Sequence, residues 1–246
     1  MLLDSMLEMG ELMLDAGAEV SRVEDTLSRM GRAYGASRMD VFVITSIISM
    51  SMEFPDTEAV TETRRIRSTG KTDFRRLEWL NELSRQCCAS PLPVAELRDR
   101  IRHIASGQKP LAVILSGSVL AAGSFAVFFG GTVWDGLVAA AFALAVCYLQ
   151  IRLGRTQVNP AAFNLVISLL IGLGVGLVCL LVPALHMDKI LIGDIMLLIP
   201  GLAMTNAIRN MLVGDTISGV IRLAESLIWA GALAGGFMIA LLILNV

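Results

Sequence analysis

The stretch that decides the fold is Pro200-Gly201-Leu202-Ala203-Met204-Thr205-Asn206-Ala207-Ile208-Arg209-Asn210-Met211-Leu212-Val213-Gly214-Asp215-Thr216-Ile217-Ser218-Gly219-Val220-Ile221-Arg222-Leu223-Ala224-Glu225. It places charged and amide side chains in sequence that is otherwise as apolar as a membrane span. Ionisable groups cost free energy in hydrocarbon, so they are rare there and usually face a cavity, a partner or a substrate path. The Pro-Gly pair adds backbone groups that only protein neighbours or water can satisfy. The stretch therefore indicates a pathway for a small molecule rather than a simple membrane anchor.

Composition around this stretch divides the chain in two. Of its 246 residues 55% are hydrophobic, and the mean hydropathy of +0.69 is too high for an ordinary soluble domain. Residues 1–110 carry 15 basic and 17 acidic side chains, whereas residues 111–246 carry five of each. We expect a small α/β cytoplasmic domain over 1–110 and a transmembrane domain over 111–246. A net charge of −2, evenly mixed, suggests no nucleic-acid partner.

Five apolar segments of 19–24 residues follow residue 110, each close to the roughly 20 residues that cross a bilayer as helix. They cover 111–129, 133–151, 162–182, 190–213 and 223–244. Basic residues gather in two connections, Arg152 with Arg155 and Arg209 with Arg222, which places those connections in the cytoplasm. The sequence predicts an α-helical protein of the plasma (inner) membrane with five transmembrane helices, a cytoplasmic N-terminus and an external C-terminus.

The first 110 residues show helical and strand patterns in turn. Apolar residues recur at helical spacing over 2–14 and 20–30, and again over 74–87 and 94–104. Residues 39–54 are rich in β-branched and apolar types and predict one or two strands, and 59–68 could form another. We therefore expect a short sheet combined with four helices.

Pro200-Gly201 lies some ten residues from either end of the fourth segment, near the expected bilayer midplane. One interpretation is a broken helix whose freed backbone groups and half-helix dipole meet a polar substrate. The other is a simple proline kink packed against neighbouring helices.

Polar residues on both sides of this region share helix faces. Thr205 and Arg209 are four residues apart, with Asn206 and Asn210 beside them, and form a stripe leading from Pro200 toward the cytoplasm. Guanidinium groups bind carboxylates in bidentate fashion, so the arginines suit a vestibule for a small carboxylate. Alternatively, Arg222 pairs with Glu225 and Arg209 snorkels to the interface. The predicted substrate-binding residues are Pro200, Gly201, Thr205, Asn206, Arg209, Asp215, Ser218, Arg222 and Glu225.

Other polar and small residues receive simpler interpretations. Asp135 and Asp194 fall at external ends of spans, where solvated carboxylates are ordinary, and this is preferred to a role in passing protons. The polar run at 17–24 is interpreted as helix capping and domain contacts. The pairs Gly172/Gly176 and Gly231/Gly235 have the spacing of close helix packing.

The sequence offers no motif for catalysis or for a cofactor. His103 and His186 stand without the neighbours that a metal site needs, and a phosphate-binding G-x-x-x-x-G-K-[ST] loop is absent from the sequence. The four cysteines form no C-x-x-C pair, which favours reduced thiols. We expect no catalytic residues, no metal and no cofactor.

Two runs of residues carry a family resemblance. Gly-Ala-Glu-Val-Ser-Arg-Val-Glu at 17–24 and the Pro-Gly-Leu…Thr-Asn-Ala-Ile-Arg…Gly-Asp…Ser-Gly…Arg…Glu series at 200–225 resemble the threonine/serine exporter family. The resemblance implies a soluble N-terminal part followed by five spans. One departure is Asn210, where the family more often has an acidic residue, so a charge partner for Arg209 is lost.

The resemblance also bears on partners and substrate. Full-length relatives carry a second five-span half, and this chain resembles the large subunit of split members, which pair with a small separate membrane protein. One such pair is associated with succinate export. The leading hypothesis is thus an ion-coupled exporter of threonine, serine or a dicarboxylate, completed by that partner and able to form homo-oligomers. A membrane-tethered cytosolic enzyme or sensor is the alternative, and a structural scaffold is third.

Overall fold

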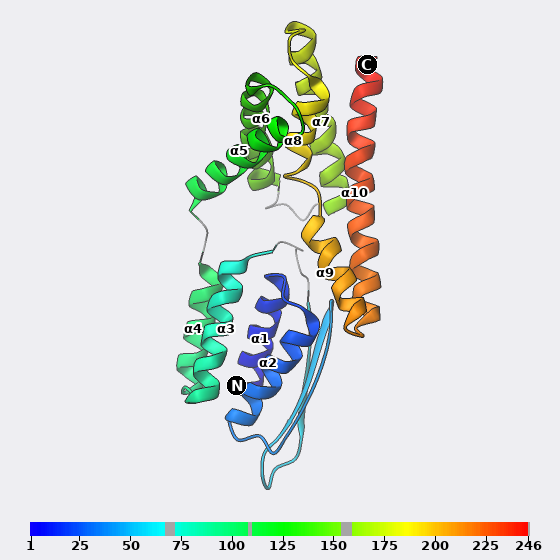
Figure 1. Cartoon of the computed structure of the whole chain (residues 1–246). Helices are drawn as coiled ribbons and strands as arrows, with labels where there is room; N and C mark the ends of the chain where they lie inside the picture. The colour runs from blue at the N-terminus through cyan, green and yellow to red at the C-terminus, as the bar shows by residue number, and fades with distance from the viewer. Residues whose placement is uncertain (67–71, 108–109, 154–158, 246) are drawn as a thin grey trace. The chain divides into compact units, whose positions relative to one another are not determined.

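The computed structural model describes residues 1–66, 72–107, 110–153 and 159–245, and these form two compact units. Unit 1 comprises Met1–Gln108 with Leu202–Ala224, and unit 2 comprises Lys109–Gly201 with Glu225–Val246. The structure is mostly helical with one small sheet, as the sequence predicts (Figure 1). The assignment of residues 1–110 to the cytoplasm remains a prediction, and Arg155, one of its supports, lies outside the described residues.

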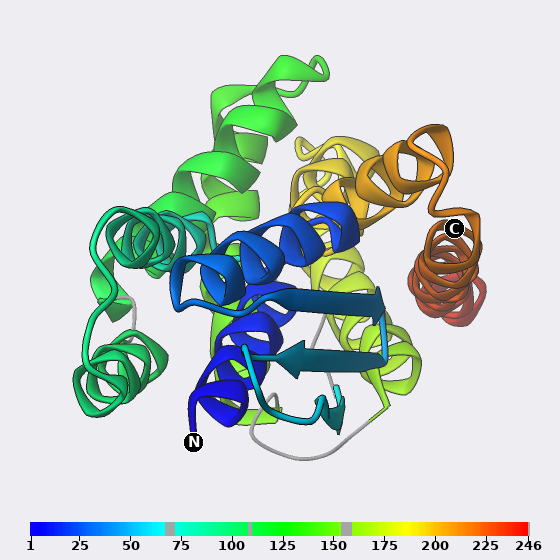
Figure 2. The same cartoon turned by 90° about the horizontal axis from the view of Figure 1, so that it is seen from below.

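Unit 1 begins with two helices, α1 (Leu2–Asp15) and α2 (Val20–Ala33). Three antiparallel strands follow in the order β1-β2-β3, namely β1 (Arg38–Ile44), β2 (Ile47–Glu53) and β3 (Val60–Arg65). Helices α3 (Phe74–Ala89) and α4 (Val94–Ser106) complete the predicted set. Figure 2 shows α1 and α2 against one face of the sheet, in agreement with their contacts to β2 and β1. The end of the predicted strand over 59–68, Arg67 and Ser68, lies outside the described residues.

The core of unit 1 follows directly from these periodicities. In β2 every second residue is buried, with Ile48, Met50 and Met52 facing the helices. The helices present apolar residues at spacings of three and four, so that one stripe of each packs on the sheet. The fully buried members of these stripes are Met6, Met9, Met13, Val23, Leu27 and Met30.

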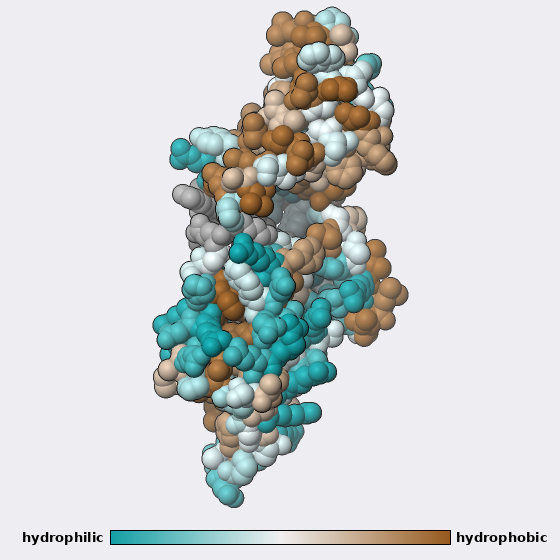
Figure 3. Space-filling model, turned by 60° about the vertical axis from the view of Figure 1, so that its left-hand side comes forward, coloured by the Kyte–Doolittle hydropathy of each residue, from teal (hydrophilic) through white to brown (hydrophobic). Residues whose placement is uncertain are grey.

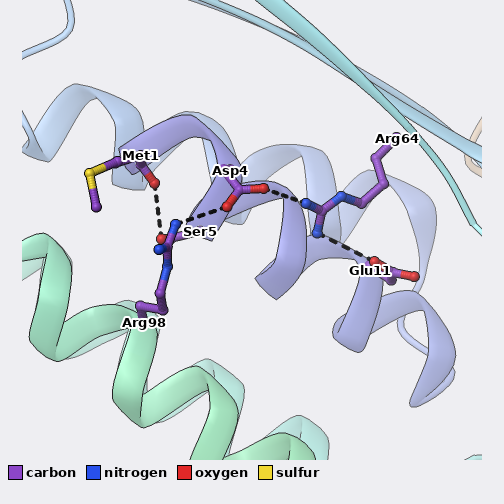
Figure 4. A network of polar contacts seen from close by, with 6 residues as sticks. All are labelled: Met1, Asp4, Ser5, Glu11, Arg64 and Arg98. Carbon is purple, nitrogen blue, oxygen red and sulfur yellow. Dashed lines mark hydrogen bonds and ion pairs between the residues drawn. The ribbon is translucent and has the colours of Figure 1, made fainter.

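A network of ion pairs fastens other elements of unit 1 to α1 (Figure 4). Asp4 accepts hydrogen bonds from Arg64 of β3 and from Arg98 of α4, the latter at 2.9 Å. Arg64 also forms an ion pair with Glu11, which lies two turns after Asp4 on α1, at 3.4 Å. The network therefore ties an edge strand and a distant helix to one end of the chain.

Unit 2 is built from α5 (Leu111–Phe128), α6 (Val133–Leu153), α7 (Pro160–Leu181), α8 (Met187–Ile195) and the C-terminal part of α10 (Thr216–Leu244). Asn159 caps α7 by accepting a hydrogen bond from the Ala161 N–H at 2.8 Å. On the face drawn in Figure 3, hydrophobic side chains gather over unit 2 and hydrophilic ones over most of unit 1. Within the described ranges four helices are long and apolar enough to span a membrane: α5, α6, α7 and α10.

The predicted fourth span, 190–213, is not one helix. Helix α8 ends at Ile195, residues 196–200 are non-helical, and α9 runs from Gly201 to Leu212 (Figure 1). Pro200 has no N–H to donate and its ring clashes with a preceding carbonyl, which explains why the helix restarts after it. The helix is therefore broken rather than simply kinked, and the contact of the break with a substrate stays a prediction. Five transmembrane helices are not confirmed, because α8 and α9 are each too short to span.

Glycines decide which helices of unit 2 pack closely. A Cβ on Gly172 would lie 2.7 Å from the Cβ of Ala240 in α10, and one on Gly176 would meet Leu244. The predicted close packing at Gly172/Gly176 is thus confirmed, and that face is occupied. Gly231 and Gly235, on another side of α10, have no atom within 4 Å of a built Cβ.

Candidate functional site

Residues 202–224 of this stretch form a tight helical hairpin within unit 1. Gly214 has φ +95°, a left-handed conformation that favours glycine and turns the chain from α9 into α10. The Asp215 N–H donates to the Asn210 carbonyl at 2.9 Å and closes the turn. A Cβ on Gly219 would lie 2.8 Å from the Ala207 carbonyl oxygen, so the glycine lets the two helices approach. The hairpin holds Arg209, Asp215 and Ser218 in fixed relation.

The start of α2 brings the second polar run of the sequence to this hairpin. Gly17, with φ +90°, ends the turn after α1, and Glu19 occupies the residue before α2. The Glu19 side chain makes no capping hydrogen bond but forms an ion pair with Arg209, Oε1 to Nη1 2.8 Å. Its side chain is only 18% exposed, whereas that of Arg209 is 62% exposed. One end of the pair is anchored and the other is reachable from solvent.

Glu24, one turn further along α2, adds a second carboxyl group. Its Oε1 accepts a hydrogen bond from the Val43 N–H of β1 at 2.9 Å. Burial raises the pKa of Glu24 above its ordinary value, the Val43 N–H opposes that rise, and the charge of Asp215 adds to it. Glu24 and Asp215 therefore share one electrostatic environment.

Two polar atoms of the hairpin are buried without a hydrogen-bond partner. They are Oδ2 of Asp215 and Oγ of Ser218, the latter in a fully buried residue. Buried polar atoms without protein partners cost free energy, and in native proteins each has an explanation such as a bound water, an ion, strain or a functional role. We define the Arg209 cluster as Glu19, Glu24, Arg209, Asp215 and Ser218. It combines one accessible cation with three carboxyl groups and one unpaired hydroxyl.

The structure distributes the predicted site residues unevenly. Arg209, Asp215 and Ser218 belong to the Arg209 cluster, and Arg209 pairs with Glu19 rather than snorkelling alone. Asn210 is buried. The charge partner of Arg209 is Glu19, from a distant part of the sequence. The other predicted residues are the exposed Thr205 and the half-buried Asn206 on α9, the half-buried Arg222 on α10, and Pro200, Gly201 and the exposed Glu225 in unit 2.

Sequence reasoning missed Glu19 and Glu24, which it interpreted as capping residues. The sequence nevertheless indicated these residues, because the runs at 17–24 and 200–225 are the two that carry the family resemblance. Their meeting depends on contacts between residues 190 positions apart, as in Glu19 and Arg209. Helical spacing alone carries no information on such contacts.

The prediction that Asp135 and Asp194 are solvated is wrong, since both are fully buried. Asp135 accepts hydrogen bonds from the N–H and hydroxyl of Thr132 and from the N–H of His186, and lies 3.0 Å from His186 Nδ1. His186 therefore does not stand alone, and the Asp135 carboxylate joins two connections of unit 2. Neither oxygen of Asp194 has a hydrogen-bond partner.

Metal ligands do not converge in the part of the chain that the structure describes. No group of three His, Cys, Asp or Glu side chains there could hold a metal ion. The four cysteines are free thiols, with Cys87 and Cys147 buried. The chemistry that the Arg209 cluster offers is therefore ionic and hydrogen-bonding recognition.

Comparison with known proteins identifies the family of the chain. Residues 4–244 match the family described as "Putative threonine/serine exporter". A similar curated protein is the "Probable threonine/serine exporter" of Mycobacterium tuberculosis (strain ATCC 25618 / H37Rv), 24% identical over 242 residues. That alignment covers 97% of this chain and 45% of the relative, so the chain spans about half the length of the relative. No solved structure matches the chain. Because the family match covers nearly all of its residues, this chain is a member of the threonine/serine exporter family.

Proposed function

We propose that the chain is a subunit of a membrane exporter that moves small carboxylates, threonine or serine first among them, out of the cytoplasm. Membership of an exporter family supports transport rather than an enzymatic reaction. The observation that carries the proposal is the ion pair between the exposed Arg209 and the largely buried Glu19, set beside two further carboxyl groups. Together these groups are complementary to a molecule bearing both charges.

Recognition follows from an exchange of partners within the Arg209 cluster. The substrate carboxylate replaces Glu19 on the guanidinium of Arg209, whose planar fork can bind both carboxylate oxygens. The released Glu19, with Glu24 and Asp215, then receives the substrate ammonium group. The unpaired Ser218 hydroxyl is suited to the hydroxyl of threonine or serine, because an unsatisfied buried polar group gains most from a new hydrogen bond.

The charges of the cluster favour an amino acid over a dicarboxylate. A dianion such as succinate would place a second negative group among Glu19, Glu24 and Asp215, which repel it. An amino acid presents an ammonium group there instead. We therefore rank threonine and serine above succinate as substrates of this chain.

The proposal includes ion coupling and a second half. Midplane sites of secondary transporters lie between repeats, and the relative is about twice as long as this chain. A small membrane protein that supplies a second five-span half would complete the pathway. Export against a gradient then requires coupling to an ion or proton gradient.

The test is uptake into inverted membrane vesicles, in which export from the cytoplasm is read as accumulation of labelled substrate. Vesicles with the chain and its small partner are compared with vesicles that lack the chain, for threonine, serine and succinate. We expect accumulation of threonine and serine above background and weak competition by succinate. Accumulation of succinate alone would reverse the substrate ranking, and no accumulation of any of the three would remove the proposed function.

A further inference from the structure

Asp194 is a buried carboxyl group that the Arg209 cluster does not use. It lies in the last turn of α8 and is 0% exposed, and neither of its oxygens has a hydrogen-bond partner. Asp135, equally buried in the same unit, has both of its oxygens hydrogen-bonded. The two buried aspartates therefore differ: hydrogen bonds stabilise the charged form of Asp135, whereas Asp194 has none.

The packing around α8 is close and apolar. The helix contacts α5, α6 and α7, all in unit 2. A Cβ on Gly193, next to Asp194, would lie 2.5 Å from the Ala122 carbonyl oxygen and 3.1 Å from the Ala126 Cβ. Ile190, one turn before Asp194 on the same helix face, is also fully buried. The Asp194 side chain thus lies on the face of α8 that packs in the apolar core of unit 2.

Charged neighbours do not neutralise Asp194 within the described ranges. Asp188 pairs with Lys189 at 2.9 Å, and Asp135 pairs with His186. The guanidinium of Arg152 lies over the Tyr148 ring, and α5 carries no titratable side chain. The titratable groups on α8, its N-terminal flank and the helices packed against it are His186, Asp188, Lys189, Asp135, Cys147, Tyr148, Arg152 and Cys179, and none of them is hydrogen-bonded to Asp194.

These observations decide which form of the carboxyl group is compatible with the site. An ionised carboxylate without hydrogen bonds in apolar surroundings is so costly that such groups take up a proton instead. The last turn of a helix carries the negative end of the helix dipole, which opposes a negative charge further. A metal cation would need several oxygen ligands, and no group of three candidate ligands converges in the described residues. A proton needs no additional ligand.

We propose that Asp194 is a proton-binding site of unit 2, protonated while the apolar core is closed and deprotonated when water reaches the non-helical segment 196–200 beside it. The proton passes between the carboxyl oxygen and water, and no other bond changes. This inference rests on the proposed function for its role, since an exporter that exchanges protons for substrate needs such a group. The position of Asp194, two residues before the break that follows α8, is suited to coupling its exposure to a movement there.

The first measurement needs no transport. The full chain in proteoliposomes is treated with dicyclohexylcarbodiimide, which modifies protonated carboxyl groups in apolar surroundings, and the labelled residue is identified by mass spectrometry. We expect label on Asp194 that decreases as the pH is raised and the carboxyl group ionises. Asp188→Asn, a change in the same helix at a side chain that is 65% exposed, should leave this label unchanged. No label on Asp194 at any pH, or label that does not change with pH, would overturn the proposal.

The second measurement separates this site from the proposed function. With the partner present, Asp194→Asn should lose threonine export driven by a proton gradient but retain exchange of labelled for unlabelled threonine, which moves no net proton. Asp194→Glu, which keeps a carboxyl group, should retain gradient-driven export with a changed pH dependence. Gradient-driven export at the wild-type rate in Asp194→Asn would overturn the proposal. Failure of the wild type to move threonine in either assay would remove the proposed function, and the pH-dependent label would then decide the proton site alone.

Discussion

At the scale of single residues, the ion pair between Arg209 and Glu19 has the properties of a contact that exchanges partners. Ion pairs between two exposed side chains contribute only about 0–1 kcal/mol, but this pair is exposed at Arg209, 62%, and largely buried at Glu19, 18%. A substrate carboxylate can therefore reach Arg209 from solvent, whereas Glu19 then needs a new cationic partner such as the substrate ammonium group. Glu19 is mostly buried and stays close by, so it can restore the pair after the substrate leaves.

The first prediction concerns Arg209. Arg209→Ala should reduce threonine export to background, whereas Arg209→Lys should recover part of it, because an ammonium keeps the charge but loses the bidentate fork. Export rate in vesicles and thermal stability of the purified chain are measured for both variants. Arg29→Ala is the matched control, since Arg29 is another exposed arginine in an ion pair, with Asp25 at 2.8 Å, outside the cluster.

Arg29→Ala should export like the wild type. If Arg209 only covers apolar surface, the lysine variant should export fully and the alanine variant should lose stability instead. Export at the wild-type rate by Arg209→Ala would rule out its role in substrate binding.

The second prediction concerns Glu24, whose pKa is raised mainly by burial. A carboxyl group with a raised pKa favours the folded state below its ordinary pKa of 4.5, and this contribution is lost as pH rises through the folded-state pKa. Glu24→Gln keeps the acceptor for the Val43 N–H and removes the charge. It should therefore melt at a higher temperature than the wild type near neutral pH and at the same temperature near pH 4.5.

Export should decrease in the same variant, because a neutral amide receives an ammonium group less well than a carboxylate does. Glu58→Gln, at an exposed position, should change neither the melting curve nor export. A stabilised Glu24→Gln variant with full export would exclude Glu24 from substrate recognition.

At the scale of elements, the two halves of the predicted fourth span have separate roles. The distribution of basic residues predicts that 186–189 lie outside and Arg209 inside, which would require the chain to cross between them. The nine residues of α8 cover about 14 Å as helix, and the chain then continues through turns in which the N–H groups of Leu197 and Leu198 donate to the carbonyls of Asp194 and Ile195. These segments alone fall short of the roughly 30 Å of hydrocarbon, so a crossing would also need part of α9.

Thiol accessibility tests this path. In a chain whose cysteines are replaced by serine, Ala184→Cys, at an exposed residue before α8, should react with an impermeant maleimide from outside intact cells. Leu212→Cys, at a residue of α9 that is 82% exposed, should react only in inverted vesicles. Labelling of both positions from the same side would show that α8 and the break do not cross.

Sequence patterns could predict a disruption of the helix at Pro200, as a break or a kink, but not where α9 belongs. Hydropathy is averaged over a window, so the apolar residues of α9 and α8 merged into one segment of 24 residues. The effect of proline on a helix is local, so it can be predicted from the sequence. The grouping of Leu202–Ala224 with residues 1–108 depends on long-range contacts such as Glu19 to Arg209, which have no local pattern.

Two adjacent glycines of α10 provide a prediction on helix packing. A Cβ on Gly236 would lie 2.4 Å from the Leu165 carbonyl oxygen of α7, whereas one on Gly235 would meet nothing within 4 Å. Gly236→Val should destabilise the purified chain by about 1–3 kcal/mol, the usual range for overpacking. Gly235→Val shares the helix and the residue type and should melt like the wild type, and equal melting of both variants would contradict the observed packing.

At the scale of the whole molecule, the chain leaves an apolar face of α10 without a partner in unit 2. Gly231 and Gly235 have open space around them, and Leu227, Met238 and Leu242 on the same helix are all more than half exposed. Lipid can cover such a face, but small residues spaced by four also let another helix approach closely. The faces at Gly172 and Gly176 do not offer the same opportunity, because α10 already covers them.

The last prediction is that this chain does not transport by itself and that the Gly231/Gly235 face meets the second half. Purified alone into proteoliposomes, it should show no threonine transport, and addition of the small membrane partner should restore it. Gly235→Val, which should leave the fold of the chain unchanged, should weaken co-purification of the partner and decrease transport together, because the valine side chain holds the helices apart. Gly117→Val, at a glycine of α5 with equally open surroundings, is the matched control and should retain both. A particle mass equal to two copies of the chain, with transport and without the partner, would identify the second half as another copy. Transport by a single copy would contradict the requirement for a second half.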